Sequence, residues 1–229
     1  MIIVQVEGNI AVGKSTFLNY VKNRMNNNNN NNKLKIKFID EPLSKWMNVN
    51  SCNLFNLYYQ NQNEYSELFQ THVFLTMLRN CLKENYKDNF DIIFMERSLY
   101  SSVYCFDKLL LNNHSVRPIF HDILTNALES FKDKILYPDI VIYFKIENND
   151  IPSILQKRIR NRQRCEENVI SDEYLIELNN VYDKVIHDYY INDNNIKKCY
   201  IIPITKYEQQ EQCFDSIIDN ILAIATKFM

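Results

Sequence analysis

Glycine is the scarcest structural residue in this sequence, since the 229 residues contain two, Gly8 and Gly13. Several classes of nucleotide-binding protein need more. A dinucleotide-binding fingerprint and the glycine-rich loop of protein kinases each require three glycines at short spacing. A GTPase-type switch would add an Asp-x-x-Gly segment, for which no glycine is left. These three classes are therefore excluded.

Other features are also missing from the sequence. No run of about 18 apolar residues is present, so we expect no membrane-spanning helix. The six cysteines and four histidines form no C-x-x-C pair and lack the spacing of metal ligands, which favours reduced thiols and no zinc site. The net charge of −2 provides no field that would attract nucleic acid or an acidic membrane. Because an apolar run begins at residue 2, we expect no signal or transit peptide and an intracellular, cytoplasmic protein.

The two glycines lie in one segment, Gly8-Asn-Ile-Ala-Val-Gly13-Lys14-Ser15, which fits the pattern G-x-x-x-x-G-K-[ST]. An apolar run precedes the segment and a helical pattern follows it, which is the context that a phosphate-binding loop (P-loop) requires. We expect its backbone N–H groups to surround phosphate oxygens, and a side chain at either glycine to block them. A chance match or an inert anion-binding turn is the alternative. The predicted ATP-binding residues are Gly8, Asn9, Ile10, Ala11, Val12, Gly13, Lys14, Ser15 and Thr16.

Two side chains of this segment have specific roles in the pattern. Lys14 would reach the β- and γ-phosphates, and the Ser15 hydroxyl would coordinate Mg²⁺. The sequence therefore predicts an enzyme of phosphoryl transfer that uses ATP as donor and Mg²⁺ as cofactor.

Short apolar runs alternate with helical patterns along the chain. Strands are predicted at residues 2–6, 34–39, 91–95, 139–144 and 199–203, and helices near 14–25, 51–60, 63–86, 99–113, 117–134, 150–163, 171–190 and 207–227. This alternation predicts an α/β fold with a five-stranded parallel sheet, helices on both faces and a single domain over residues 1–229. Ligands of such sheets bind beyond the carboxyl ends of the strands, where Gly8, Glu41 and Glu96 are expected to meet. The asparagine run at 26–32 predicts a disordered insertion after the first helix.

Two of the strand ends carry acidic residues. Glu41 precedes Pro42, which stops the second strand, and its carboxylate could accept the proton of an attacking hydroxyl group. Glu96 and Arg97 end the third strand, where they would supply an acid near Mg²⁺ and a cation near the acceptor. The alternatives are a solvated loop acid for Glu41 and a structural ion pair for Glu96 and Arg97.

The helical pattern at 63–86 places Gln70, Val73 and Met77 on one stripe. Such a stripe is usually part of a hydrophobic core. Gln70 is the unusual member, because its amide offers a donor and an acceptor that could recognise the edge of a base.

The most basic segment is Arg158-Ile-Arg160-Asn-Arg162-Gln-Arg164-Cys-Glu166-Glu167. Arginines at every second position cannot share one helical face, so some of them must leave the helix for a loop. We interpret residues 162–168 as an arginine-rich lid that closes over the transferred phosphate. A solvated basic patch is the alternative.

These motifs together resemble the deoxyribonucleoside kinase family, from Gly8 to about Tyr190. The resemblance rests on the order and spacing of Glu41-Pro42, Trp46-Met-Asn-Val-Asn50, Phe69-Gln70, Glu96-Arg97-Ser98 and Arg162-Gln-Arg164-Cys-Glu166-Glu167. It implies a P-loop kinase fold and ATP-dependent phosphorylation of the 5′-hydroxyl of deoxyribonucleosides, which salvages nucleosides as DNA precursors. It also implies a homodimer, for which the apolar helices at 99–134 could supply the interface.

The resemblance implies a role for each matching residue. Glu41 would be the general base, with Arg97 beside it, and Ser15 and Glu96 would serve Mg²⁺. Gln70 would pair with the base between the rings of Trp46 and Phe106, Tyr59 and Glu167 would hold the 3′-hydroxyl, and Arg162 and Arg164 would clamp the phosphates with Lys14. The implied substrate-binding residues are Glu41, Trp46, Tyr59, Gln70, Val73, Met77, Arg97, Ser102, Phe106 and Glu167.

The base preference is expected to depend on Met77 and Ser102. Purine-accepting members of the family tend to carry Arg and Asp at these positions, and thymidine-tolerant members carry Met and Ala. We therefore expect a pyrimidine-leaning or broad specificity, with Tyr58, where those members have Met, crowding the sugar side.

Two other functions share parts of this pattern. A nucleoside-monophosphate kinase such as thymidylate kinase has the same fold and P-loop, but Glu41 would repel the acceptor phosphate. A non-catalytic nucleotide-binding protein would not need a base, a Mg²⁺ ligand and lid arginines together.

Overall fold

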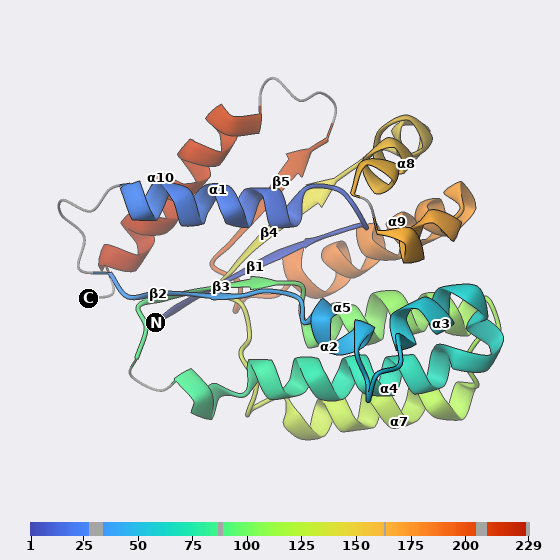
Figure 1. Ribbon diagram of the computed structural model, residues 1–229. Coiled ribbons are helices and arrows are strands. Elements are labelled where there is room, and N and C mark those ends of the chain that lie inside the picture. Colours follow the sequence, from blue (N-terminus) through green and yellow to red (C-terminus); the bar gives the residue numbers. More distant parts are fainter. Residues whose placement is uncertain (28–33, 87–88, 163, 205–209, 228–229) are drawn as a thin grey trace.

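The computed structural model describes residues 1–27, 34–86, 89–162, 164–204 and 210–227 (Figure 1). Most of the predicted asparagine insertion, residues 28–32, lies outside these ranges. Gln163 of the predicted lid lies outside them as well.

The described residues form one parallel sheet. Its strands are β1 (Ile2–Gly8), β2 (Ile36–Ile39), β3 (Ile92–Glu96), β4 (Ile140–Lys145) and β5 (Lys198–Pro203), in the spatial order β2-β3-β1-β4-β5. Each pair of neighbouring strands is parallel. The predicted five-stranded parallel sheet is therefore confirmed, and all carboxyl ends face the same edge.

The central strand β1 is buried along its whole length. Its side chains alternate between the two faces of the sheet, as the pleat requires. Val4 and Val6 belong to the core on one face, and Ile3 belongs to the core on the other. Gln5 and Glu7 are fully buried polar exceptions within this strand.

Helices cover both faces of the sheet, as the apolar strands predict. Figure 1 shows α1 (Lys14–Asn27) and α10 (Gln210–Lys227) on one side of the sheet, with α4 (Gln62–Cys81) and α7 (Pro118–Phe131) on the other. The short 3₁₀ turn η1 (Lys83–Tyr86) lies between α4 and β3, and the 3₁₀ turn η3 (Asn148–Asp150) follows β4.

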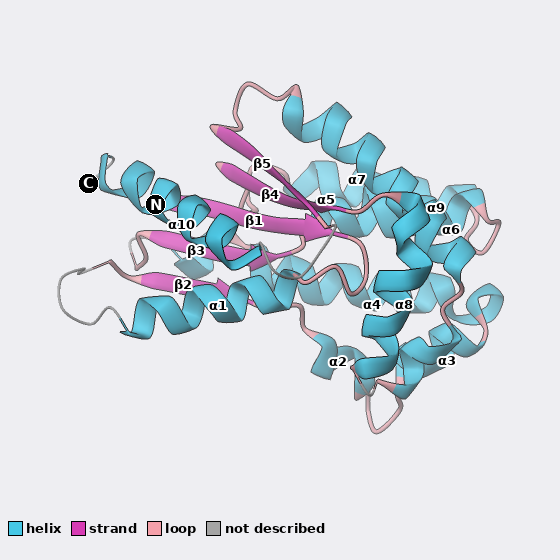
Figure 2. Cartoon of the chain, turned by 90° about the horizontal axis from the view of Figure 1, so that it is seen from above, coloured by secondary structure: helices cyan, strands magenta, loops and turns pink. Residues whose placement is uncertain are grey.

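A second group of helices surrounds the carboxyl ends of the strands (Figure 2). It comprises α2 (Leu43–Met47), α3 (Leu54–Gln60), α8 (Ile151–Asn161), the 3₁₀ turn η4 (Cys165–Val169), and α9 (Asp172–Val185) with its π-helical end η5 (Ile186–Ile191). The chain after β3 adds α5 (Leu99–Ser101), the π-helical turn η2 (Ser102–Asp107) and α6 (Lys108–Asn112).

Several predicted boundaries differ from the structure. The helix expected at 63–86 stops at Cys81, because Leu82 adopts an extended backbone. The helix expected at 51–60 starts at Leu54, since the side chain of Asn53 caps it. The short helix α2 was not predicted. No helix in the described ranges has the length and apolarity needed to cross a membrane.

Candidate active site

The P-loop connects β1 to α1 in a backbone conformation that only glycine adopts readily. Gly8 and Gly13 have φ angles of +139° and +116°. A Cβ on Gly8 would also lie 2.9 Å from the carbonyl oxygen of Phe144 in β4. At Gly13 the nearest atom, Nη1 of Arg158, would be 3.7 Å away.

This geometry adds a second reason for the two glycines. A Cβ at Gly8 would collide with the neighbouring strand β4, and Gly13 has a φ angle that other residues rarely adopt. The sequence prediction that a side chain at either glycine would block the N–H groups from phosphate stays a prediction.

Side chains from distant elements fix the shape of the P-loop. Asn9 is fully buried, and its Nδ2 donates to the carbonyl of Leu175 in α9 at 2.7 Å. Nη1 of Arg158 in α8 donates to the carbonyls of Ala11 and Val12 at 3.2 and 2.6 Å. The loop is therefore held from both sides before any ligand contacts it.

Lys14 lies at the start of α1 and is 3% exposed. Its Nζ donates to the carbonyls of Gly8 and Asn9 at 3.2 and 2.8 Å. Burial, followed by the nearby Arg97 cation, lowers the pKa of Lys14 to about 7. An anion next to Nζ would oppose both effects, which fits a lysine that receives phosphate.

Ser15 in the first turn of α1 lies beside Glu96 at the end of β3. The Ser15 hydroxyl lies 3.0 and 3.1 Å from the two carboxylate oxygens of Glu96. Hydroxyl and carboxylate oxygens are the ligands that Mg²⁺ prefers. Among the described residues there is no cluster of three or more His, Cys, Asp or Glu side chains that could hold a metal, so a cation here would depend on phosphate oxygens or water for its remaining ligands.

Glu41 follows β2 and forms an ion pair with Arg97, with 3.0 Å between Oε1 and Nε. Arg97 is 5% exposed and also donates to the carbonyl of Gly8 and to the hydroxyl of Tyr182. The pKa of Arg97 lies above its ordinary value, because Tyr182, Glu41 and Glu7 outweigh the opposing effect of burial. Arg97 is therefore a permanent cation that orients the carboxylate of Glu41.

An aromatic chamber extends from Glu41 away from the P-loop. Trp46 is 3% exposed and packs edge-on against Phe69, with ring centroids 5.8 Å apart. Its Nε1 donates to Thr76 of α4 at 2.8 Å, which fixes the plane of the indole. Phe106 lies across the chamber with its ring 4.6 Å from the Arg97 guanidinium carbon.

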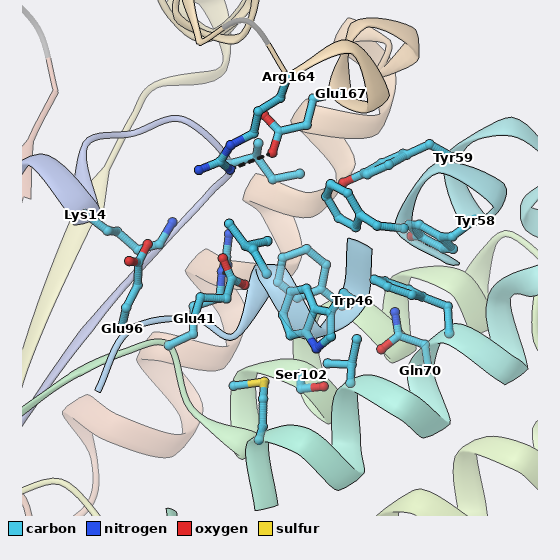
Figure 3. A pocket seen from close by; sticks show the side chains of 18 of the residues that line it. Lys14, Glu41, Trp46, Tyr58, Tyr59, Gln70, Glu96, Ser102, Arg164 and Glu167 are labelled. Atoms are coloured by element: carbon cyan, nitrogen blue, oxygen red, sulfur yellow. Dashed lines mark hydrogen bonds and ion pairs between the residues drawn. The ribbon is translucent and has the colours of Figure 1, made fainter. Parts of the chain in front are cut away.

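Gln70 lies deep in this chamber and is 2% exposed. Its Oε1 is buried and has no hydrogen-bond partner in the protein. A buried acceptor without a partner is costly, so Gln70 is a candidate to accept a hydrogen bond from a ligand. Figure 3 shows Gln70 and Tyr58 at one end of the pocket, Lys14 and Glu96 at the other, and Glu41 and Trp46 between them.

The arginine-rich segment leaves its helix as predicted. Arg158 lies in α8, Arg162 is the residue that ends this helix, and Arg164 precedes η4. Nη1 of Arg164 is 3.1 Å from Oε1 of Glu167, which is 3% exposed (Figure 3). Nη1 of Arg162 lies 3.8 Å from the other oxygen of the same carboxylate. Closure of this segment as a lid stays a prediction.

One pocket contains every side chain that was predicted to act in catalysis, substrate binding or metal binding. The structure brings together Lys14, Ser15, Glu41, Trp46, Tyr59, Gln70, Val73, Met77, Glu96, Arg97, Ser102, Phe106, Arg162, Arg164 and Glu167. Of the remaining P-loop residues, Ile10 also lines the pocket, Asn9, Ala11 and Val12 are buried in the loop, and Thr16 is exposed.

Sequence reasoning assigned no role to three residues that line the pocket, namely Leu43, Phe55 and Phe69, although Phe69 belongs to the Phe69-Gln70 motif. Leu43 lies in the unpredicted helix α2. Phe55 precedes Tyr58 and Tyr59 by three and four positions on α3, so helical periodicity could have placed it on the same face. Burial raises the pKa values of both tyrosines well above the ordinary range, so their hydroxyls are neutral.

The fold and the pocket together define a P-loop protein in which a phosphate-binding loop faces an aromatic chamber. The family described as deoxynucleoside kinase matches residues 4–227. The chain belongs to the deoxynucleoside kinase family.

The individual relatives are named after nucleosides with different bases. The chain is 29% identical to mitochondrial thymidine kinase 2 of Macaca fascicularis over 80% of its length, and 30% identical to a probable deoxycytidine kinase of Fowlpox virus over 84%. These matches cover 63% and 72% of the relatives. It is 27% identical to mitochondrial deoxyguanosine kinase of Xenopus laevis, over 79% of this chain and 71% of the relative. The chain thus spans less than two thirds of the thymidine kinase.

Proposed function

We propose that this protein transfers the γ-phosphoryl group of ATP to the 5′-hydroxyl of a deoxyribonucleoside. The observation that supports this most directly is the Glu41–Arg97 ion pair, which lies in the same pocket as Lys14 of the P-loop. A general base that deprotonates a sugar hydroxyl must lie between the phosphate-binding loop and the chamber for the base, and the carboxylate of Glu41 lies there.

Glu41 would accept the proton of the 5′-hydroxyl as its oxygen attacks phosphorus. Arg97 would hold the carboxylate toward the acceptor, and it would also stabilise negative charge near the transferred group. Phosphoryl transfer depends on positioning and charge stabilisation more than on covalent chemistry. The pocket supplies both, because its cations lie on the P-loop side and its aromatic rings lie on the acceptor side.

Ser15 and Glu96 are the residues that would hold Mg²⁺, and their oxygen donors fit this ion. When bound, Mg²⁺ neutralises charge on the β- and γ-phosphates. Arg162 and Arg164 are the candidates for clamping the phosphates from the lid segment. Their present partner, Glu167, would then be freed to accept a hydrogen bond from the 3′-hydroxyl beside Tyr59.

The chamber favours a pyrimidine base or a broad preference. Gln70 offers its unpaired acceptor to a base N–H, and Met77 and Ser102 are the nearby side chains on α4 and η2. Neither of the two is charged, so no fixed charge is available to select a purine. Tyr58 stacks on Phe69 with ring centroids 4.5 Å apart, and this pair of rings narrows the chamber on the side formed by α3.

A kinase for nucleoside monophosphates is the less supported alternative. Its acceptor would carry a phosphate next to Glu41, where the carboxylate would repel it. The family match also favours a nucleoside as acceptor.

The same proposal includes a homodimer and a single catalytic domain over residues 1–229. Four large apolar side chains are more than half exposed on the outer faces of α4 and α7, namely Leu68, Leu75, Ile119 and Ile123. Several large apolar side chains exposed on neighbouring helices are consistent with a protein interface. The patch lies partly on α4, outside the range 99–134 expected from the sequence.

Light scattering should give the mass of a dimer for the wild type, and the double variant Leu75→Glu with Ile123→Glu should give the mass of a monomer. A monomeric wild type would refute the dimer.

The cytoplasmic location stays a prediction, and two of the relatives above carry the word mitochondrial in their names.

The activity itself is tested by supplying ATP and Mg²⁺ with thymidine, deoxycytidine, deoxyadenosine, deoxyguanosine or thymidylate as acceptor. We expect monophosphate products from the pyrimidine nucleosides and no product from thymidylate. Efficient phosphorylation of thymidylate would establish the alternative kinase, and ATP binding without any transfer would establish a non-catalytic protein.

A further inference from the structure

The two neighbouring glutamates of η4 face different parts of the molecule. Glu167 lines the pocket and pairs with Arg164. Glu166 faces away from that pair and toward α3, where Nδ2 of Asn53 donates to its Oε1 at 2.8 Å. Both glutamates are buried, with 6% and 3% of their surface exposed. The turn thus carries one carboxylate for the site and one for the neighbouring helix.

Asn53 uses both ends of its side-chain amide. Its Oδ1 accepts from the backbone N–H of Asn56 at 2.9 Å and so caps the start of α3. Its Nδ2 makes the contact with Glu166. A serine, threonine or aspartate could cap the helix, but an aspartate could not also donate to a carboxylate. The amide therefore ties η4 to the first turn of α3.

These two elements lie next to each other, and both line the acceptor chamber. Helix α3 carries Phe55, Tyr58 and Tyr59, which line the pocket. Turn η4 carries Glu167 and directly follows Arg164. A change in the distance between α3 and η4 would separate Tyr59 from Glu167, because each residue is fixed to its own element.

Glu166 is suited to accept the hydrogen bond from Asn53 as an ionised carboxylate. Hydrogen bonds from its own backbone N–H and from Asn53 lower its pKa, despite the opposing effect of burial. A hydrogen bond from a neutral amide to a carboxylate is stronger than one between neutral groups.

We propose that Asn53 and Glu166 are positioning residues that form a latch between α3 and the lid segment. The latch holds Tyr59 and Glu167 at the spacing needed to grip one sugar, and this role rests on the proposed nucleoside kinase activity. Without the latch, part of the binding free energy of each nucleoside would be used to fix the position of η4 relative to α3. The affinity for the nucleoside would fall, while the general base would remain in place.

The test variant is Asn53→Asp, because aspartate caps a helix as well as asparagine does. It removes the donor and sets a carboxylate against Glu166. We expect the KM for the preferred nucleoside to rise about tenfold or more, the range for losing a hydrogen bond to a charged group. The melting temperature should also fall, because the bond is lost in the free protein, whereas the kcat at saturating nucleoside should change little.

The rescue variant is Asn53→Asp with Glu166→Gln. The glutamine amide can donate to the new aspartate, which restores the contact with its polarity reversed. The double variant should regain most of the nucleoside affinity, although Glu166→Gln alone also weakens the original contact. A purely structural role would not predict this recovery.

A matched control exists at the other end of α3, eight residues further along the chain. Asn61 is the residue before α4, and its Nδ2 donates to Oε2 of Glu64 at 3.0 Å on the exposed surface. Asn61→Asp makes the same chemical change beside a glutamate at the start of a helix, outside the pocket. It should leave the KM for the nucleoside unchanged.

Hydrogen exchange over residues 164–170 gives a second readout that needs no activity. Exchange should be faster in Asn53→Asp and should return toward the wild-type rate in the double variant. Wild-type exchange and a wild-type KM in Asn53→Asp would overturn the latch, and so would the absence of rescue. A wild-type protein that phosphorylates no nucleoside would overturn the proposed function, and the exchange rates would still decide whether the latch exists.

Discussion

The guanidinium of Arg97 forms an ion pair with the carboxylate of Glu41 at 3.0 Å, although the two residues follow different strands of the sheet. Arg97 has a φ angle of +61°, which a residue with a large side chain rarely adopts. Its guanidinium is held by the Gly8 carbonyl, the Tyr182 hydroxyl and the ring of Phe106. Such a conformation persists only where surrounding contacts compensate for its strain. The proposed base thus has its orientation set by the buried core.

Removing the charge of Glu41 tests this carboxylate as the general base. Glu41→Gln should lower kcat by about 10²–10⁴-fold, which is the usual contribution of a general base. The fold should be retained, because the amide oxygen of glutamine can still accept a hydrogen bond from Arg97. The neighbouring Asp40 pairs with Lys22 on the surface, so Asp40→Asn is the matched control and should retain activity. An equally active Glu41→Gln enzyme would remove Glu41 from this role.

The hydroxyl of Tyr182 is predicted to orient Arg97. Tyr182→Phe removes one hydrogen bond to a buried charge, which should lower the free energy of unfolding by about 1.5–3 kcal/mol. It should also reduce kcat, because Arg97 and with it Glu41 lose a fixed position. Tyr143 is an adjacent buried tyrosine whose hydroxyl donates to Asp183 at 2.7 Å instead. If Tyr143→Phe costs as much activity as Tyr182→Phe, the orienting role is wrong.

Glu7 in β1 should make stability depend on pH. It is fully buried, and this burial raises its pKa above the ordinary value of 4.5, against the opposing effect of Arg97. The folded state then binds a proton that the unfolded state has lost, so stability falls as the pH rises from 4.5 through the folded pKa. Glu7→Gln cannot ionise and should escape this loss.

Urea unfolding of both proteins between about pH 5 and pH 8 measures the effect. The free energy of unfolding of Glu7→Gln, relative to that of the wild type, should increase with pH and then level off. The variant can still accept the hydrogen bond that Ser98 donates to Glu7 Oε1 at 3.0 Å. A relative stability that decreases with pH would contradict the raised pKa.

The base preference should follow the side chains at the end of the chamber. Met77→Arg with Ser102→Asp would introduce a fixed charge pair that offers donors and acceptors to a purine. The ratio of kcat/KM for thymidine to that for deoxyadenosine should fall by about tenfold or more, as expected when polar groups are left unpaired by the wrong base. Thr71→Arg adds the same cation on the exposed face of α4 and should leave the ratio unchanged. An unchanged ratio in the double variant would show that Met77 and Ser102 do not contact the base.

The sequence determined the local elements of this protein. The apolar runs predicted every strand of the sheet to within about two residues. Burial on both faces demands continuous apolar side chains in the central strands, and the partly exposed edge strands β2 and β5 keep shorter apolar runs. The glycine scarcity and the Lys14-Ser15 pair predicted the P-loop, since its backbone needs glycine at fixed positions. Lys14, Ser15, Glu41 and Gln70 were found through chemistry that is readable over a few positions, whereas residues such as Tyr59, Phe106 and Glu167 came from the resemblance to a known family.

The tertiary structure alone decided how these pieces face one another. The strand order β2-β3-β1 brings Glu41, Arg97 and Gly8 together, and no local pattern contains that order. The π-helical turn η2 sets where Ser102 and Phe106 point, and a regular helix was expected there. The close packing of Gly8 on Phe144 and the bond between Asn53 and Glu166 span 136 and 113 positions. Contacts over such distances depend on how the whole chain packs, whereas periodicity and turn chemistry depend only on neighbouring residues.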